Sequence, residues 1–484
     1  MQNTETAEVK SPEDRKQDNR DKWIYPMQQL ASGVMQSFFA TYLNNLMTLV
    51  YIFPIGVAGV VEAMGQALGW VVGPLSGATI DRFSFKKSKY WPWIIIGSIG
   101  VAVCWIVIFV LPVFVSDPTR MVIPVAIIIL IRAVLEGPDA AVGTLLYARL
   151  ARDGKLRSYL AMWGKIGRDG MKVVVGFIFP LMLVGFMARG MSEVGAWALI
   201  AVILALSSIS LQTVTVLLTK NSRPEKEAVA GLGGPKVKSR PITATFAAIF
   251  TNRALLSAYL CQALGKVFFF YHIMGGMFLW RFYMNNMAMM AIYMTLLSLA
   301  AVAGAMLVPV AYKIIRDTKR CAAMAYIAQI AIYAAAFFIV SPQNVLGTIF
   351  IICFASFFNG MSDSFMQPLF AHGADYSVWK SGNKDYGLNM AVFGLSITTG
   401  VLVSTITRTA ALAAGGFDSA ALAAGAAVPA GVMSALHNLN TAYPLVICVI
   451  ITAILLFVYP LNDKKVAEIQ KEIAARDARD AAQV

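Results

Sequence analysis

The sequence has little charge and little of the chemistry on which enzymes depend. Charged residues make up only 14% of its 484 positions, whereas a soluble chain carries roughly 25%. Hydrophobic residues make up 58%, and the mean hydropathy is +0.67. A soluble core of this size would leave too much apolar surface in water, so the composition predicts a protein whose solvent is lipid.

Catalytic and metal-binding patterns are absent as well. The three histidines form no metal-ligand pattern, no glycine-rich loop precedes a phosphate-binding Lys-Ser/Thr pair, and no nucleophile stands with a base. The cysteines lie in or beside apolar runs without CxxC spacing: Cys104, Cys261, Cys321, Cys353 and Cys448. We therefore predict that the protein is not an enzyme and binds no metal or cofactor.

The excess of positive charge has a different meaning. The formal charge is +14, but the basic residues are spread among short connectors instead of gathering on one polar domain, which excludes a nucleic-acid partner. The connectors on the same side as the N-terminus carry most of the lysines and arginines. The positive-inside rule then places that side in the cytoplasm.

Long apolar runs fill most of the chain. A membrane-spanning helix needs about 20 apolar residues, and twelve such runs occur, at 29–54, 57–80, 92–115, 121–149, 158–187, 194–219, 254–282, 287–312, 321–341, 344–371, 386–414 and 440–461. An even number of spans puts both termini on one side, here the cytoplasm. The expected fold is an all-α, multi-pass membrane protein.

The chain divides into two halves. A charged segment rich in glycine and proline at 220–252 is typical of a cytoplasmic linker between two six-helix bundles. The division is a cytoplasmic N-terminal segment, two bundles with the linker between them, and a cytoplasmic tail: 1–28, 29–219, 220–252, 253–461 and 462–484. Residues 415–439 are expected to form an outer loop of small residues.

Several ionisable residues interrupt the apolar runs. Each costs about 2.5–3.5 kcal/mol near the bilayer centre, so each must face protein or water and is a functional candidate. In the fourth span Arg132, Glu136 and Asp139 share one helical face, and Lys165 and Arg168 follow in the fifth. We expect a polar seam between these two spans, which binds solute. The alternative is that the charges only neutralise one another and fix the register of the helices.

Other polar groups in the spans stand alone. Glu62 and Asp363 are candidates for proton coupling, as is Glu136. Lys266, His272 and Arg408 are the other isolated ionisable groups within the spans. Lone groups of this kind are as often packed against backbone carbonyls as they are ligands. Tyr271 lies on an aromatic stretch that can stack on a sugar ring, or that belongs to the aromatic belt at the membrane interface.

A short basic connector joins the second and third spans. It contains Gly77-x3-Asp81-Arg82, and Arg316-Asp317 stands in a similar basic connector in the second half of the chain. The simple interpretation is a solvated loop that fixes topology. The recurrence favours a second one, a motif at the helix ends that takes part in conformational change in an internally duplicated protein.

These residues resemble a known family. Gly77-x3-Asp81-Arg82 is similar to the loop signature of the major facilitator superfamily. The longer pattern through Lys89-Tyr90-x-Pro92-Trp93, together with 374–387 before the eleventh span, resembles the glycoside-pentoside-hexuronide:cation symporters, the melibiose-permease-like branch. The resemblance implies two pseudo-symmetric six-helix bundles. It also implies a monomeric secondary active transporter in the bacterial inner membrane, which moves a glycoside, hexuronide or related organic solute by alternating access.

The resemblance carries over only in part at the binding site. Glu136, before Pro138, matches the acidic residue of that branch in the fourth span, and Lys165 matches a basic residue in the fifth. The sodium-binding carboxylates of the second span fall on Gly69 and Gly73.

The other family positions have also changed. The acid of the first span falls near Ser37, and the lysine of the eleventh falls near Thr398, which makes these two candidate substrate-binding positions. A sodium site cannot form from such residues, because hard cations need several oxygen ligands together. We therefore expect proton coupling through Glu136. The alternatives are an ion-independent facilitator, or a lipid or lysolipid transporter on the same fold.

Overall fold

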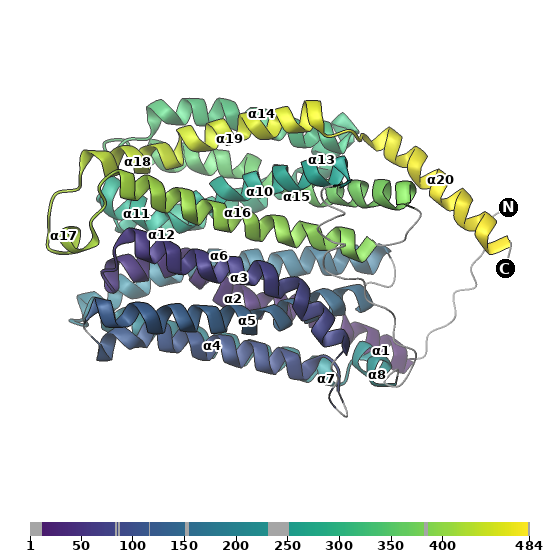
Figure 1. The fold of residues 1–484 in the computed structure, drawn as a ribbon, viewed down its shortest axis with the longest axis horizontal. Helices are drawn as coiled ribbons and strands as arrows, with labels where there is room; N and C mark the ends of the chain where they lie inside the picture. The colour runs from purple at the N-terminus through teal and green to yellow at the C-terminus, as the bar shows by residue number, and fades with distance from the viewer. Residues whose placement is uncertain are drawn as a thin grey trace.

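A computed structural model describes residues 12–82, 85, 88–115, 117–150, 154–230, 251–381 and 386–482. The named elements within this part are all helices. Figure 1 shows them as two groups of long, roughly parallel rods. The all-helical membrane fold predicted from the apolar runs is thereby confirmed.

The first half of the chain supplies one group. After a short α1 (Pro12–Asp21), its long helices are α2 (Ile24–Asn45, continued by the wider turn η1, Leu46–Val50), α3 (Ile55–Arg82), α4 (Trp91–Phe114), α5 (Pro118–Leu150), α6 (Gly154–Ala188) and α7 (Glu193–Lys220). A short α8 (Arg223–Ala230) follows inside the segment predicted as a linker.

The second half supplies the other group. It comprises α10 (Arg253–Met274) with its extensions α11 (Gly276–Phe278) and η2 (Leu279–Tyr283), α12 (Ala288–Met306), α13 (Val308–Ile315), α14 (Thr318–Ile339), α15 (Val345–Ser381), α16 (Tyr386–Ala414), α17 (Ser419–Ala423), α18 (Ala430–Asn440), α19 (Ala442–Ala453) with η3 (Ile454–Val458), and the tail helix α20 (Asp463–Ala482). Asn252 caps α10, because its side chain accepts hydrogen bonds from the backbone N–H groups of Ala254 and Leu255.

Eleven spans in the described part are long and apolar enough to cross a membrane. The twelfth long helix, α2, falls short because it carries polar residues at intervals of four, including Gln28, Ser32 and Gln36. The side chains of these three residues contact Asp139 and Glu136 of α5, so they face protein instead of lipid. The polar face of α2 is therefore the first sign of where the site lies.

The two groups touch along two seams. α3 packs against α16, and α6 packs against α12. Figure 1 shows α1 and α20 at one end of the molecule and α17 at the opposite end. We call these the α1/α20 end and the α17 end.

The segment 415–439, predicted as a loop, is in part helical. Asp418 caps α17 by accepting from the N–H groups of Ala420 and Ala421, and α18 leads directly into α19. The small residues of α17 give no amphipathic pattern, whereas α18 carries the buried residues Val432, Leu436 and Leu439 at helical spacing, which the prediction of a loop overlooked.

Candidate solute-binding and coupling site

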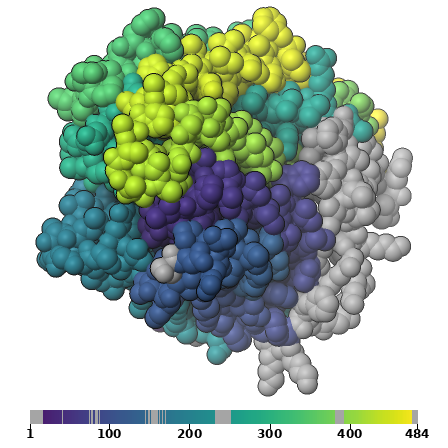
Figure 2. Space-filling model, turned by 60° about the vertical axis from the view of Figure 1, so that its left-hand side comes forward, coloured from purple at the N-terminus to yellow at the C-terminus, as the bar shows by residue number. Residues whose placement is uncertain are grey.

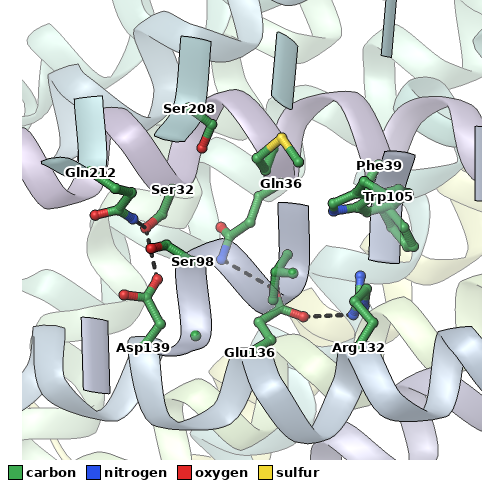
Figure 3. Close-up of a pocket in the computed structure, with 13 residues that line it drawn as sticks. Ser32, Gln36, Phe39, Ser98, Trp105, Arg132, Glu136, Asp139, Ser208 and Gln212 are labelled. Atoms are coloured by element: carbon green, nitrogen blue, oxygen red, sulfur yellow. Dashed lines mark hydrogen bonds and ion pairs between the residues drawn. The ribbon is translucent and has the colours of Figure 1, made fainter. Parts of the chain in front are cut away.

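A polar cavity lies among α2, α4, α5 and α7 (Figure 3). It measures about 40 Å³, which is room for a few water molecules. Its polar lining comprises Ser32, Gln36, Ser98, Arg132, Glu136, Asp139, Ser208 and Gln212. In this conformation the cavity has room for water-sized groups and not for a sugar ring.

Arg132 and Glu136 form an ion pair one helical turn apart on α5. The distance from Arg132 Nη2 to Glu136 Oε2 is 2.6 Å, and the guanidinium stands 4.2 Å from the ring centroid of Phe39. Gln36 of α2 makes a longer contact of 3.5 Å with the other carboxylate oxygen of Glu136. Cation–π and ion-pair contacts together fix the orientation of the buried arginine.

Asp139 lies on the same face of α5, as the sequence predicts, but its described contacts are neutral. Ser32 donates to Oδ2 at 3.2 Å, and Gln28 approaches Oδ1 at 3.4 Å while donating to the backbone carbonyl of Asp139 at 3.0 Å. Gln212 of α7 donates in turn to Ser32 at 3.1 Å. One guanidinium and two carboxyl groups therefore line the cavity, with a formal sum of −1.

The predicted seam between the fourth and fifth spans is wrong for the described residues. The charged face of α5 meets α2, α4 and α7, whereas α6 packs mainly on α2 and α12. α2 lies between them, and consecutive spans are neighbours only as a tendency. Arg168 is exposed, and its backbone packs against Gly33 of α2. The Lys165 side chain lies outside the described residues.

Three further candidates do not reach this cavity. Ser37 is 4% exposed and its hydroxyl has no described partner. Tyr271 pairs its hydroxyl with Thr407 at 2.6 Å, and Thr398 donates to the Gly394 carbonyl of its own helix. They occupy other parts of the two groups of helices.

The second half has its own ion pair near the middle of its helices. Lys266 Nζ of α10 lies 2.7 Å from Asp363 Oδ1 of α15, and Gln262 donates to the same oxygen at 3.1 Å. Both members were predicted as isolated groups because each stands alone in its own span.

Glu62 and Arg408 join the two halves. Arg408 Nη2 of α16 lies 3.0 Å from Glu62 Oε2 of α3, and the side chains are 1% and 3% exposed. Asn44 donates to Glu62 Oε2 at 2.8 Å, and Thr405 donates to Oε1 at 3.1 Å. Sequence reasoning missed this pair because its members are 346 positions apart.

Two more contacts close the same end of the molecule. Arg281 of η2 pairs with Glu193 of α7 at 3.0 Å, and the Ser419 hydroxyl donates to the Phe53 carbonyl at 2.6 Å. We call these two contacts and the Glu62–Arg408 pair the seal. Figure 2 shows the yellow-green surface of the second half lying directly against the purple surface of the first half at the α17 end.

The conformational motif differs between its two copies. Gly77 lies within α3, and the side chains of Asp81 and Arg82 lie outside the described residues. In the second copy, Arg316 adopts a left-handed conformation with φ of 57°, and Asp317 caps α14 by accepting from the Arg320 N–H at 2.8 Å.

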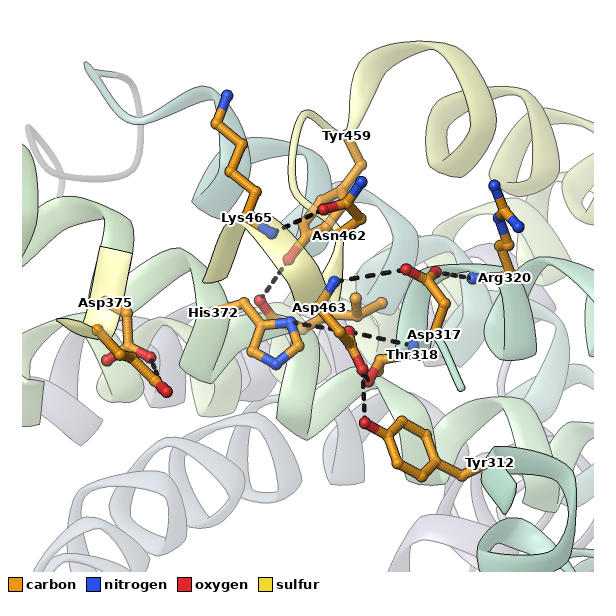
Figure 4. A network of polar contacts seen from close by, with 12 residues as sticks. Tyr312, Asp317, Thr318, Arg320, His372, Asp375, Tyr459, Asn462, Asp463 and Lys465 are labelled. Atoms are coloured by element: carbon orange, nitrogen blue, oxygen red, sulfur yellow. Dashed lines mark hydrogen bonds and ion pairs between the residues drawn. The ribbon is translucent and has the colours of Figure 1, made fainter. Parts of the chain in front are cut away.

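The second copy also anchors the tail (Figure 4). Asp317 Oδ2 accepts from the backbone N–H of Asp463 at 3.4 Å, while the Asp463 carboxylate accepts from Tyr312 at 2.8 Å and from the Thr318 hydroxyl at 3.0 Å. Further along α20, Trp379 of α15 donates to Glu472 at 2.6 Å. The motif thus holds α20 against the ends of α13 to α15.

The whole helical core matches a known family. A sequence profile described as "MFS/sugar transport protein" matches residues 24–463. The chain belongs to this family. Like the other members of the major facilitator superfamily, this transporter is a multi-pass membrane protein and not an enzyme. Searching the curated proteins finds no match to this transporter.

Solved structures confirm the fold. A D-xylose–proton symporter has a TM-score of 0.63 at 10% identity, with 91% of this chain and 98% of that chain covered. A bacterial homologue of the human lysosomal transporter Spinster, inward-facing and unoccupied, gives 0.62 at 14% identity, covering 93% and 98%. The nucleoside transporter NupG gives 0.59 at 17% identity, covering 91% and 99%. At such identities the likeness concerns the fold alone.

Proposed function

We propose that this transporter moves a glycoside, a hexuronide or a related organic solute together with a proton across the bacterial inner membrane. The family match supports a secondary transporter of sugar-like solutes. The likeness of 77–93 and 374–387 to the glycoside-pentoside-hexuronide symporters supports the narrower cargo class. The basic connectors support a cytoplasmic position for the α1/α20 end. In that orientation the seal lies on the outer side, and the conformation is closed to the outside.

The observation that carries proton coupling is the charge of the α5 cavity. Arg132 compensates one carboxylate, and two carboxyl groups, Glu136 and Asp139, share the space. The lining residues from α2, α4 and α7 are formally neutral. A buried excess charge is unfavourable at membrane depth, so one proton shared by the two carboxyl groups makes the site neutral.

Solute uptake into vesicles that hold the protein in a known orientation tests this proposal. A panel of uronides, disaccharides and aromatic acids is offered under pH and sodium gradients imposed separately. We expect a pH gradient to drive accumulation and a sodium gradient to have no effect. Glu136→Gln and Asp139→Asn each leave a formal sum of zero, so each is expected to abolish pH-driven accumulation while solute exchange continues.

A matched control is Glu468→Gln, the same substitution on an exposed position of α20, which keeps pH-driven accumulation. If Glu136→Gln also keeps it, Glu136 is not the coupling group. If a sodium gradient drives uptake in the unaltered protein, the proton assignment fails.

A further inference from the structure

One buried guanidinium in the seal is satisfied only in part. Arg408 is 1% exposed, and Nη2 is its partnered nitrogen, bonded to Glu62. Its Nε and Nη1 atoms are buried without a hydrogen-bond partner among the described residues. Buried donors are nearly always partnered in folded proteins, so this guanidinium is short of acceptors in the sealed state.

The carboxylate of Glu62 is, in contrast, fully engaged. Its Oε1 accepts from Thr405, and its Oε2 accepts from Asn44 and Arg408. The imbalance in the pair therefore lies on the guanidinium. Glu62 belongs to the first half and Arg408 to the second, so the two separate whenever the halves part at the α17 end.

We propose that Arg408 binds the carboxylate of an anionic solute when the seal opens, and that Glu62 holds that place in the sealed state. The inference rests on the proposed function and narrows its cargo to carboxylate-bearing solutes such as hexuronides. A guanidinium presents parallel N–H groups that match a carboxylate in two-point contact. Once Glu62 has moved away, a solute carboxylate restores the counter-charge, and a neutral glycoside does not.

The surroundings of Arg408 suit a sugar acid. Tyr271, an aromatic group predicted to stack on a sugar ring, is fixed at the same level because its hydroxyl pairs with Thr407, the residue before Arg408. Gly275 also lies beside the arginine, since a Cβ there would be in ordinary contact with Arg408 Cδ at 3.8 Å. A carboxylate on the guanidinium therefore places the rest of the solute beside an aromatic ring.

The test uses full-length protein in liposomes and two solutes that differ in one group, methyl β-D-glucuronide and methyl β-D-glucoside. Thr409→Cys reports opening, because Thr409 packs against Gly59 inside the seal and a membrane-impermeant maleimide reaches it only from an open outer side. Protein without this cysteine measures background labelling by the native thiols, four of which are buried.

We expect the glucuronide to raise the labelling rate and the glucoside to leave it unchanged. A hydrogen bond to a charged group corresponds to an affinity for the glucuronide on the order of tenfold to a hundredfold higher than for the glucoside. Arg408→Lys keeps the charge but loses the two-point contact, so it is expected to lose most of that preference. Glu62→Gln, a second variant that keeps Arg408 intact, is expected to be labelled fast with either solute, and to retain the preference for the glucuronide over the glucoside in solute uptake.

Two results overturn the inference in different ways. If both solutes are transported and both raise the labelling rate equally, and Arg408→Lys gives the same rates, Arg408 does not bind the solute carboxylate and the proposed function still stands. If neither solute is transported by the unaltered protein, the proposed cargo class is wrong and the inference fails with it.

Discussion

Removing one partner of the Glu62–Arg408 pair is expected to open the transporter to the outside. In the sealed state both side chains are almost fully buried. A lone charge left in such a place costs about 3–5 kcal/mol, and each 1.4 kcal/mol is a factor of about ten. Glu62→Gln, which strands the guanidinium, should therefore shift the equilibrium toward the outward-open state roughly a hundredfold to several-thousandfold.

Replacing both partners gives the opposite expectation. Buried ion pairs exchanged for apolar residues of similar volume are often neutral or stabilising. Glu62→Leu combined with Arg408→Met leaves no uncompensated charge, so the seal should stay closed. The assay is again the labelling rate of Thr409→Cys by an impermeant maleimide.

The comparison between single and double variants tests whether the Glu62–Arg408 pair controls opening of the outer side. We expect fast labelling in Glu62→Gln and slow labelling in the double apolar variant. Equal labelling rates in the unaltered, single and double variants would refute the reasoning that the pair controls the outer side. Arg281→Ala serves as a control, because its pair with Glu193 is about one-third exposed and such pairs contribute only about 0–1 kcal/mol.

Three further predictions concern the scaffold. Gly304→Ala would place a Cβ on the carbonyl oxygen of Phe357 and should lower stability by about 1–3 kcal/mol in thermal unfolding, whereas Gly394→Ala, which has open space, should not. Burial raises the pKa of Glu225 above its usual 4.5, so the folded state binds the proton more tightly than the unfolded state. The free energy of unfolding should therefore fall as pH rises from about 4.5 through the raised pKa. Glu225→Gln should lack this pH dependence. Asp463→Ala removes the acceptor that anchors α20, so limited proteolysis should release the tail faster than in the unaltered protein.

Apolar runs predict the helices well because lipid requires every backbone group to be bonded within its own span. The runs at 92–115 and 194–219 differ from α4 and α7 by one residue at each end. Where small residues replace large apolar ones, as in α17, the pattern disappears and a helix is missed. α2 is the converse case, since its polar face lowers its hydropathy although it lies within the bundle.

The sequence predicts which polar residues belong to the site, but it does not predict which of them pair with one another. The i, i+4, i+7 spacing placed Arg132, Glu136 and Asp139 on one face of α5, and the cavity confirms that they lie together. The partners on α2 were missed, although Gln28, Ser32 and Gln36 recur every four residues in an apolar run. Pairs such as Glu62–Arg408 depend on how the halves pack, which no local pattern encodes.

Solute-driven proton movement tests the central claim most directly. A transported solute is added to lightly buffered, de-energised vesicles, and the external pH is followed. Proton coupling predicts a brief alkalinisation in the unaltered protein and none in Glu136→Gln or Asp139→Asn, which have only one carboxyl group left in the cavity. Entry of labelled solute into the unaltered protein without any change in external pH would contradict the account.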